Sequence, residues 1–246
     1  MFRYQLLIEY VGTNFRGWQI QKKGSTIQGL IQEKLTKLLK EKIILNGSGR
    51  TDTGVHAIAQ SAHFDCKNKI IDLIKFLKSI NHFLNEDGIA ITKVKKRSSK
   101  FHSRFSAKQR IYKYIIFNQL SVPVIEKKRG WHVRKQLDID LIKKGAKKLI
   151  GTHDYSVFRA SSCHAKSPIK TIKSVKIKSL KNKIEIEFNS QSFLQQQVRS
   201  MVGCLKYLGE KKWDLKNFDR VFKSKKRILC APPAPPEGLF LVKVIY

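Results

Sequence analysis

Hydrophobic and polar residues alternate in several stretches of the chain, which is the pattern of half-buried β-strands. In residues 2–11 the apolar positions Tyr4, Leu6, Ile8 and Tyr10 fall on one face. The same pattern predicts further strands over residues 43–47, 57–65, 89–94, 109–117, 171–178, 183–189 and 239–245. Strands are therefore expected along the whole length of the chain.

Between these strands, apolar residues recur at intervals of three and four, the spacing of amphipathic helices. It predicts helices over residues 27–39, 71–84, 138–150, 193–208 and 214–222. Ser25 and Gln28 have the spacing of a capping box, and Asp138 and Asp214 are candidate N-caps. Gly209 is a candidate helix stop.

Strands and helices alternate in both halves of the chain, which predicts an α+β fold. We expect two plait-like halves of the ferredoxin or RRM type that share a large, mostly antiparallel sheet, with a central basic cleft. The expected domains are residues 1–104 and residues 105–246. A parallel doubly wound sheet is the alternative. It fits less well, because residues 171–178 and 183–189 read as a direct hairpin.

The net charge of the chain indicates which class of partner it binds. The 246 residues include 50 Lys and Arg against 18 Asp and Glu, a formal net charge of +32. The excess is spread, with 19 basic and 8 acidic groups in residues 1–104 and 31 and 10 in the remainder. A distributed positive field favours a nucleic-acid partner, although a lysine-rich solvated surface has the same composition. Hydrophobic residues make up 41% of the chain, which indicates a globular protein rather than a disordered basic tail.

The four cysteines, at positions 66, 163, 204 and 230, have no spacing typical of a zinc site or of a secreted disulfide framework. Reduced thiols in a cytoplasmic protein are the simplest interpretation. The first residues lack the apolar region of a signal peptide, and no apolar run has the length of a membrane span. We therefore expect no contact with a membrane.

Candidate chemistry lies in the loop of residues 49–57, which follows the apolar run 43–45. Asp52 stands two residues after Arg50 and two before Gly54. A glycine-containing loop at the end of a strand presents its side chains and lets a ligand approach closely. Asp52 is thus a candidate catalytic acid in a basic chain. The alternative is a turn aspartate paired with Arg50.

The Asp52 loop is one of five sequence blocks that together resemble the tRNA pseudouridine synthase A family. In chain order they are residues 17–19 (GWQ), 49–56 (GRTDTGVH), 101–107 (FHSRFSA), 198–203 (VRSMVG) and 234–239 (APPEGL). They span essentially the whole chain. The chain departs from the family pattern at residues 195–197 (QQQ) and at Lys170, where local RNA contacts are affected rather than the chemistry.

The resemblance implies an isomerase that converts uridine to pseudouridine in the anticodon stem-loop of tRNA, at positions 38–40. It also implies a homodimer that needs no metal, nucleotide or redox cofactor. Two other classes of protein remain as alternatives: a non-catalytic RNA-binding protein or RNA chaperone, and a nuclease. The first does not explain an acid displayed on a basic surface, and the second lacks a carboxylate cluster for Mg²⁺.

The same resemblance assigns roles to four residues. Asp52 is the catalytic carboxylate, acting as a nucleophile or as a base. Arg199, on the predicted helix 193–208, is implied to hold that carboxylate ionised, and otherwise is a surface arginine. Tyr112 is implied to stack on the flipped uracil, and otherwise is a core tyrosine like Tyr114. Arg50 is implied to fill the vacated stack or to bind phosphate. Trp18, His56 and His102 are expected to order loops.

Overall fold

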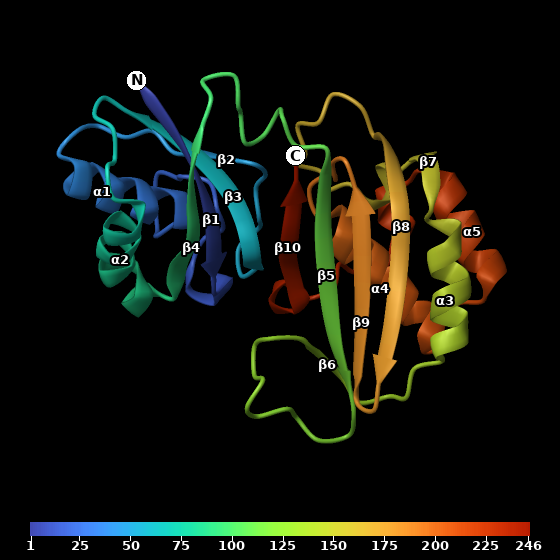
Figure 1. Ribbon diagram of the computed structural model, residues 1–246. Coiled ribbons are helices and arrows are strands. Elements are labelled where there is room, and N and C mark those ends of the chain that lie inside the picture. Colours follow the sequence, from blue (N-terminus) through green and yellow to red (C-terminus); the bar gives the residue numbers. More distant parts are fainter. The chain divides into compact units, whose positions relative to one another are not determined.

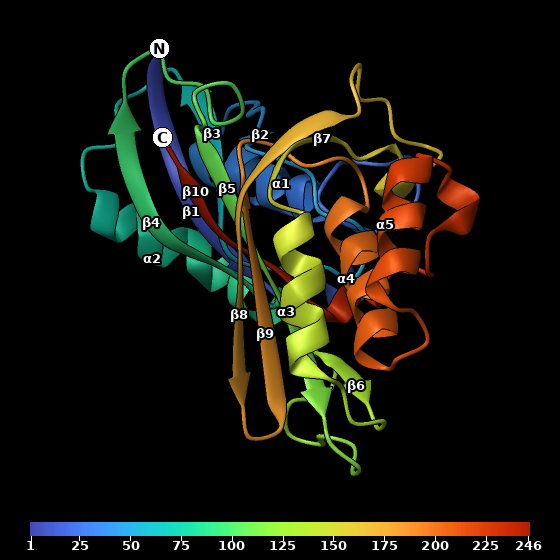
Figure 2. The same cartoon turned by 90° about the vertical axis from the view of Figure 1, so that its right-hand side faces the viewer.

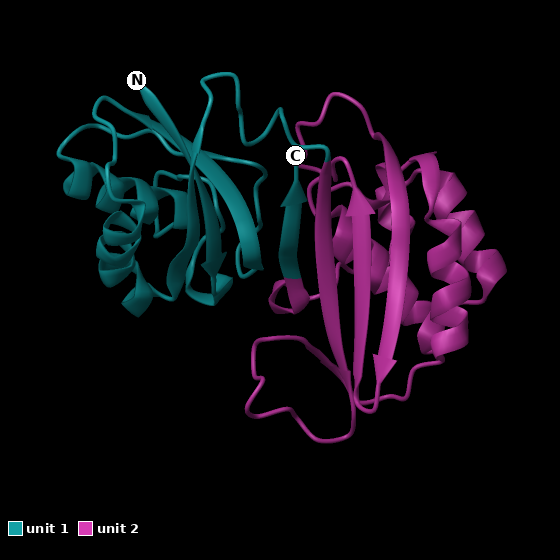
Figure 3. Ribbon diagram, viewed as in Figure 1, with its two compact units in different colours: residues 1–108, 240–246 teal, residues 109–239 magenta.

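The computed structural model describes residues 1–246 as two units, each of which contains strands and helices (Figure 3). Unit 1 contains residues 1–108 and 240–246, and unit 2 contains residues 109–239. The domain boundary expected after residue 104 falls close to this division. The expected C-terminal domain included the end of the chain. In the structure the final seven residues belong to unit 1 instead.

The sheet of unit 1 has the strand order β4-β1-β3-β10. These strands are β1 (Phe2–Tyr10), β3 (His56–Cys66), β4 (Ile89–Arg97) and β10 (Leu239–Ile245). Strand β1 pairs antiparallel with β3 and with β4, whereas β10 runs parallel to β3. The alternation read from residues 2–11 is confirmed, because Tyr4, Leu6, Ile8 and Tyr10 are all buried.

Two helices, α1 (Ile27–Leu39) and α2 (Leu73–Leu84), lie on the same side of this sheet (Figure 1). The capping box expected at Ser25 is wrong. Thr26 is the N-cap of α1 and accepts a hydrogen bond from the Gly29 N–H. Gln28 instead accepts from the Ile20 N–H and donates to the Leu45 carbonyl, so it ties the helix to two loops.

The strand expected over residues 43–47 is also shorter than predicted. Only β2 (Asn46–Gly47) pairs with β3. The main-chain N–H groups of Ile43 and Leu45 donate to side chains of α1, Thr36 Oγ1 at 3.2 Å and Gln32 Oε1 at 3.0 Å. Side-chain acceptors thus replace a partner strand, which the alternation of apolar residues could not reveal.

Unit 2 contains an antiparallel sheet with the order β5-β9-β8-β7. Its strands are β5 (Gln109–Asn118), β7 (Gly151–Asp154), β8 (Ile169–Leu180) and β9 (Lys183–Ser190), with the short β6 (Trp131–Val133) parallel to β5. The hairpin of β8 and β9 is as predicted. The prediction of a mixed α+β protein with mostly antiparallel strands is confirmed, and the doubly wound parallel alternative is wrong.

Three helices, α3 (Ile139–Lys148), α4 (Gln197–Gly209) and α5 (Leu215–Ser224), cover one face of this sheet (Figure 2). Asp138 and Asp214 are the N-caps of α3 and α5, as predicted. Helix α4 begins at Gln197 rather than at residue 193, because Gln196 before it takes a left-handed conformation with φ of 61°. None of the helices is both long enough and apolar enough to cross a membrane.

A buried histidine makes the stability of unit 1 depend on pH. His63 of β3 is only 2% exposed, and its Nδ1 accepts a hydrogen bond from the Ser103 N–H at 3.2 Å. Burial, with a smaller effect of the Arg3 charge, lowers the pKa of His63 to about 4. The unfolded chain, in which a histidine has its ordinary pKa of about 6.5, therefore binds more protons between these two values.

We predict that the free energy of unfolding falls by roughly 3 kcal/mol as the pH is lowered from about 6.5 to about 4. Since the folded pKa is the lower one, this stability is fully present above pH 6.5. Denaturant titrations across this range, on the wild-type chain and on His63→Gln, measure it. The variant should be less stable at pH 7 and should lose most of the pH dependence. An unchanged dependence in His63→Gln would assign the effect to other groups.

Candidate active site

Three hydrogen bonds hold the loop that carries Asp52. The Tyr10 hydroxyl lies 2.7 Å from Thr51 Oγ1, and the Trp18 N–H donates to the Thr51 carbonyl at 3.1 Å. The Val55 N–H donates to the Asp52 carbonyl, also at 3.1 Å, which closes a tight turn. Two of the three bonds come from distant residues, Tyr10 and Trp18, and only the third is local to the loop. The main chain of the loop is therefore fixed on both sides of this residue.

Close backbone contact explains why residues 12–18 and 49–55 belong together. An added Cβ on Gly17, whose φ is +83°, would lie 2.6 Å from the Thr51 carbonyl oxygen. A Cβ on Gly12 would lie 2.0 Å from the Val55 carbonyl oxygen. Only glycine permits both approaches. The GWQ block thus supplies the surface against which the Asp52 loop is built.

Within this rigid loop the side chains of Asp52 and Arg50 differ in exposure. Asp52 is half-buried, whereas Arg50 is exposed. The Gln60 side chain donates to the Gly49 carbonyl and accepts from the Ser48 hydroxyl, so the residues just before Arg50 are also held. A carboxylate on a preorganised loop needs little rearrangement before it can react, which is what a catalytic group requires.

His56 and Trp18 are buried parts of the same structure. The Gly12 N–H donates to His56 Nδ1 at 3.0 Å, and the imidazole stacks on the Phe240 ring with centroids 4.8 Å apart. In a neutral imidazole, the ring nitrogen that accepts a main-chain hydrogen bond carries no proton, so this contact favours the His56 tautomer with its proton on Nε2. Trp18 packs against Gly47, where no Cβ would fit. Both residues order the loop.

Unit 2 places two tyrosines on the same face of β5. Tyr114 is fully buried, its hydroxyl donates to the Pro235 carbonyl at 2.7 Å, and burial raises its pKa well above the usual value. Tyr112 is 8% exposed and contacts the Phe193 ring edge-on, with centroids 5.3 Å apart. Tyr114 is therefore a structural residue, and Tyr112, with part of its surface accessible, is the better candidate for substrate contact.

Arg199 lies in the first turn of α4 and is tied to the proline-rich segment of residues 232–236. Its Nε donates to the Ala234 carbonyl at 2.7 Å, and the Ala234 N–H donates back to the Arg199 carbonyl at 2.9 Å. The Pro232 carbonyl approaches so closely that a Cβ on Gly203 would lie 2.1 Å from it. Two blocks that are more than thirty residues apart in the sequence thus form one structure that orients the arginine.

The four candidate residues fall into two pairs. Asp52 and Arg50 share one loop of unit 1, and Tyr112 and Arg199 belong to β5 and α4 of unit 2. The contacts that make Tyr10, Thr51 and Ala234 supporting residues were not predicted from the sequence. Tyr10 looked like an ordinary core position of an alternating strand. The Ala234 contact depends on a main-chain atom, which leaves no signal in residue types.

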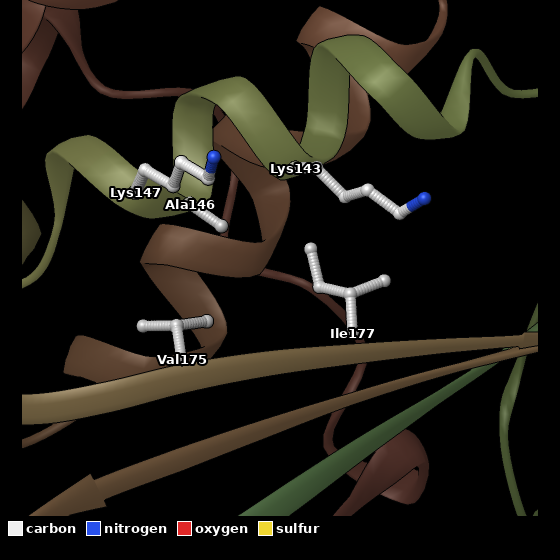
Figure 4. Close-up of a pocket in the computed structure, with 5 residues that line it drawn as sticks. All are labelled: Lys143, Ala146, Lys147, Val175 and Ile177. Carbon is white, nitrogen blue, oxygen red and sulfur yellow. The ribbon is translucent and has the colours of Figure 1, made fainter.

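Other parts of the surface offer less chemistry. No group of three or more His, Cys, Asp or Glu side chains is arranged to hold a metal ion. A hollow of about 130 Å³ lies between α3 and β8, lined by Ala146, Val175 and Ile177 and by the stems of Lys143 and Lys147 (Figure 4). Its floor is aliphatic. It contains none of the candidate residues.

Comparison with known proteins finds similar sequences over the whole length of the chain. The family model described as "tRNA pseudouridine synthase" matches residues 6–106 and 146–246. A protein of Pelagibacter ubique named tRNA pseudouridine synthase A is 73% identical over 246 residues, which is 100% of both chains. Proteins of the same name from Parvibaculum lavamentivorans and Paramagnetospirillum magneticum are 37% and 39% identical over 247 residues, covering 100% of this chain and 100% and 96% of theirs.

Proposed function

Because the chain belongs to the tRNA pseudouridine synthase family, we propose that it modifies uridines 38–40 in the anticodon stem-loop of tRNA. It is an isomerase that forms pseudouridine in tRNA. The observation that carries this function is the full-length similarity to the curated relatives. The geometry adds a carboxylate, Asp52, on a loop that is held by two main-chain hydrogen bonds and by one between the Tyr10 and Thr51 hydroxyls.

We further propose that Asp52 is the catalytic group. The isomerisation breaks the bond between ribose C1′ and uracil N1 and forms one between C1′ and C5. The C5 proton is then lost, and N1 gains a proton. A carboxylate can serve this sequence as a nucleophile that forms a covalent intermediate or as a base that removes a proton. Both routes require Asp52 to be ionised, and both need the uracil free to rotate.

The other three candidates have supporting roles in this proposal. Arg199 keeps Asp52 ionised, since a neighbouring cation lowers the pKa of a carboxyl group. Tyr112 stacks on the extruded uracil, because flipping a paired base costs a few kcal/mol that contacts must recover. Arg50, exposed on the Asp52 loop, fills the vacated stack or binds phosphate. The edge-on contact with Phe193 supports a fixed ring orientation for Tyr112.

We infer that the protein works in the cytoplasm as a homodimer. A tRNA is larger than the surface that one such chain offers, and the family usually pairs. All four cysteines are free thiols in the structure, which suits a reducing compartment. Light scattering of the active protein at micromolar concentration measures the oligomeric state.

The test of the function is to incubate the protein with unmodified tRNA, without added metal, and to map pseudouridine. Pseudouridine at positions 38–40 supports the proposal. Tight binding without any conversion would favour the alternative of a non-catalytic RNA-binding protein or chaperone. Shortened tRNA would indicate a nuclease. Mapping on total tRNA then identifies which tRNAs are substrates.

We predict that tRNA affinity falls steeply with salt, because both halves of the chain carry excess positive charge. Each neutralised phosphate contributes about −0.7 to −0.9 to the slope of log K against log salt. For about six to ten phosphate contacts, affinity should fall on the order of 10³-fold or more between 50 and 200 mM salt. Filter binding at several salt concentrations measures the slope. A flat response would argue against an extended basic binding surface.

A further inference from the structure

An exposed phenylalanine stands out in the most basic segment of unit 1. Residues 93–108, which run from the middle of β4 to the end of the first segment of unit 1, contain seven Lys and Arg and no Asp or Glu. In the middle of this segment Phe105 is 76% exposed. A single exposed apolar side chain is ordinary by itself. Here the surroundings of the ring make it unusual.

The turn that carries Phe105 is rigid. The His102 N–H donates to Ser106 Oγ at 3.0 Å, and the Ser106 N–H donates to the His102 carbonyl at 2.9 Å. The Ser103 hydroxyl donates to the Asn46 carbonyl, and the Tyr246 hydroxyl donates to the Ser103 carbonyl at 2.9 Å. The turn is therefore fastened to two other parts of unit 1. Phe105 is held outward by structure rather than left on a loose loop.

His102 and Arg104 arrange the groups around the ring. His102 Nδ1 accepts a hydrogen bond from the Arg104 N–H at 3.1 Å, and its ring lies against Phe105 with centroids 4.4 Å apart. The Arg104 guanidinium lies 5.6 Å from the centroid of the Phe105 ring. Nearby, Arg97 lies 4.9 Å from the Phe101 ring. An aromatic ring backed by a second ring and flanked by arginine is suited to an unpaired base and its phosphate.

We propose that Phe105, with Arg104, is a stacking platform for an unpaired base of the tRNA, separate from the four candidate active-site residues. A base stacks on the accessible part of the Phe105 ring, and its phosphate pairs with Arg104 or with another basic group of residues 93–108. This inference rests on tRNA being the substrate, but not on the role of Asp52. Phe105 is a binding residue in this assignment and takes no part in the chemistry.

The test measures the affinity of the full chain for an unmodified tRNA transcript. Phe105→Ala should weaken the affinity about 10-fold or more, since the stacking of one base on an aromatic ring contributes about 1–3 kcal/mol to binding. The melting temperature should stay unchanged because the ring is exposed. Phe105→Trp should retain the affinity, and Phe105→Leu should not restore it. Ile71→Ala, which removes another exposed apolar side chain of unit 1, is the matched control and should bind normally.

Normal tRNA binding by Phe105→Ala would overturn the proposal that Phe105 is a stacking platform. Full affinity in Phe105→Leu would do so as well, because apolar contact rather than stacking would then suffice. A change of oligomeric state in Phe105→Ala, seen by light scattering with tRNA affinity unchanged, would assign the ring to contact with a second copy and also overturn it. Failure of the wild-type chain to bind tRNA would overturn the proposed function itself, an outcome that is easily distinguished from these.

Discussion

Asp52→Asn is expected to abolish the conversion of uridine to pseudouridine while tRNA binding stays normal or tightens slightly. Asparagine keeps the shape of the side chain but removes its charge and its nucleophilicity. The loss in turnover should be on the order of 10⁴-fold or more, the scale for a carboxylate that takes part in the chemistry. Tightening is expected because a negative charge near the RNA backbone is removed.

The structure makes this substitution a clean test. The loop around Asp52 is held by the Tyr10 hydroxyl, which bonds the Thr51 side chain, and by the Trp18 and Val55 N–H groups, which bond the main chain, and the substitution removes none of these bonds. The melting temperature should therefore change little. Asp87→Asn, which neutralises an exposed carboxylate of unit 1, is the control for charge and should keep full turnover. Retained turnover in Asp52→Asn with a lower melting temperature would make Asp52 a structural turn residue.

Periodicity in the sequence was sufficient to locate most elements of the fold, because a buried face imposes its own spacing on a strand or a helix. It failed where polar contacts set the local structure. Residues 43–45 have the apolar pattern of a strand, yet side chains of α1 satisfy their backbone. Residues 193–196 have the apolar pattern of a helix, yet Gln196 interrupts it with a left-handed conformation.

The buried face of a helix or strand was also harder to predict from the sequence than the position of the helix or strand itself. The sequence places Ile71 and Ile74 on the apolar face of the second helix, but both are exposed, and α2 buries Phe76, Ile80 and Leu84 instead. In β1, Gln5 alternates with Tyr4 and Leu6, so the pattern assigns it to the polar face of the strand. It is buried, and its amide donates to Ser61 Oγ. Satisfied polar groups of this kind are invisible to a pattern of hydrophobicity.

For the candidate site, a resemblance in the sequence proposed the candidate residues, whereas the geometry explains why the blocks occur together. The Asp52 loop needs Gly12 and Gly17 because its backbone touches theirs. The block at residues 198–203 needs the proline-rich segment, because Ala234 exchanges hydrogen bonds with Arg199. Both dependencies rest on contacts to main-chain atoms of a segment that is distant in the sequence. They could be found only in three dimensions.

Arg199→Met is expected to reduce turnover at least 100-fold at neutral pH and to make the remaining activity depend more strongly on pH. If Arg199 keeps the catalytic carboxylate ionised, its removal should raise the pKa of that group by about 1–3 units. The acid limb of the pH–rate profile should then move upward, and part of the activity should return at higher pH. A merely structural arginine would lower turnover without moving this limb.

The fold should tolerate the change. Methionine loses the hydrogen bond from the arginine Nε to the Ala234 carbonyl, which stabilises the protein by about 1 kcal/mol, but the Ala234 N–H still donates to the carbonyl of residue 199. The melting temperature should therefore fall only slightly.

Arg220→Met, which removes an exposed cation from α5, controls for the loss of charge and should keep both turnover and pH profile. Pseudouridine formation from pH 5 to 9, measured on both variants with saturating tRNA, decides between the two roles. An unchanged acid limb in Arg199→Met would show that the arginine does not act through the carboxylate of Asp52.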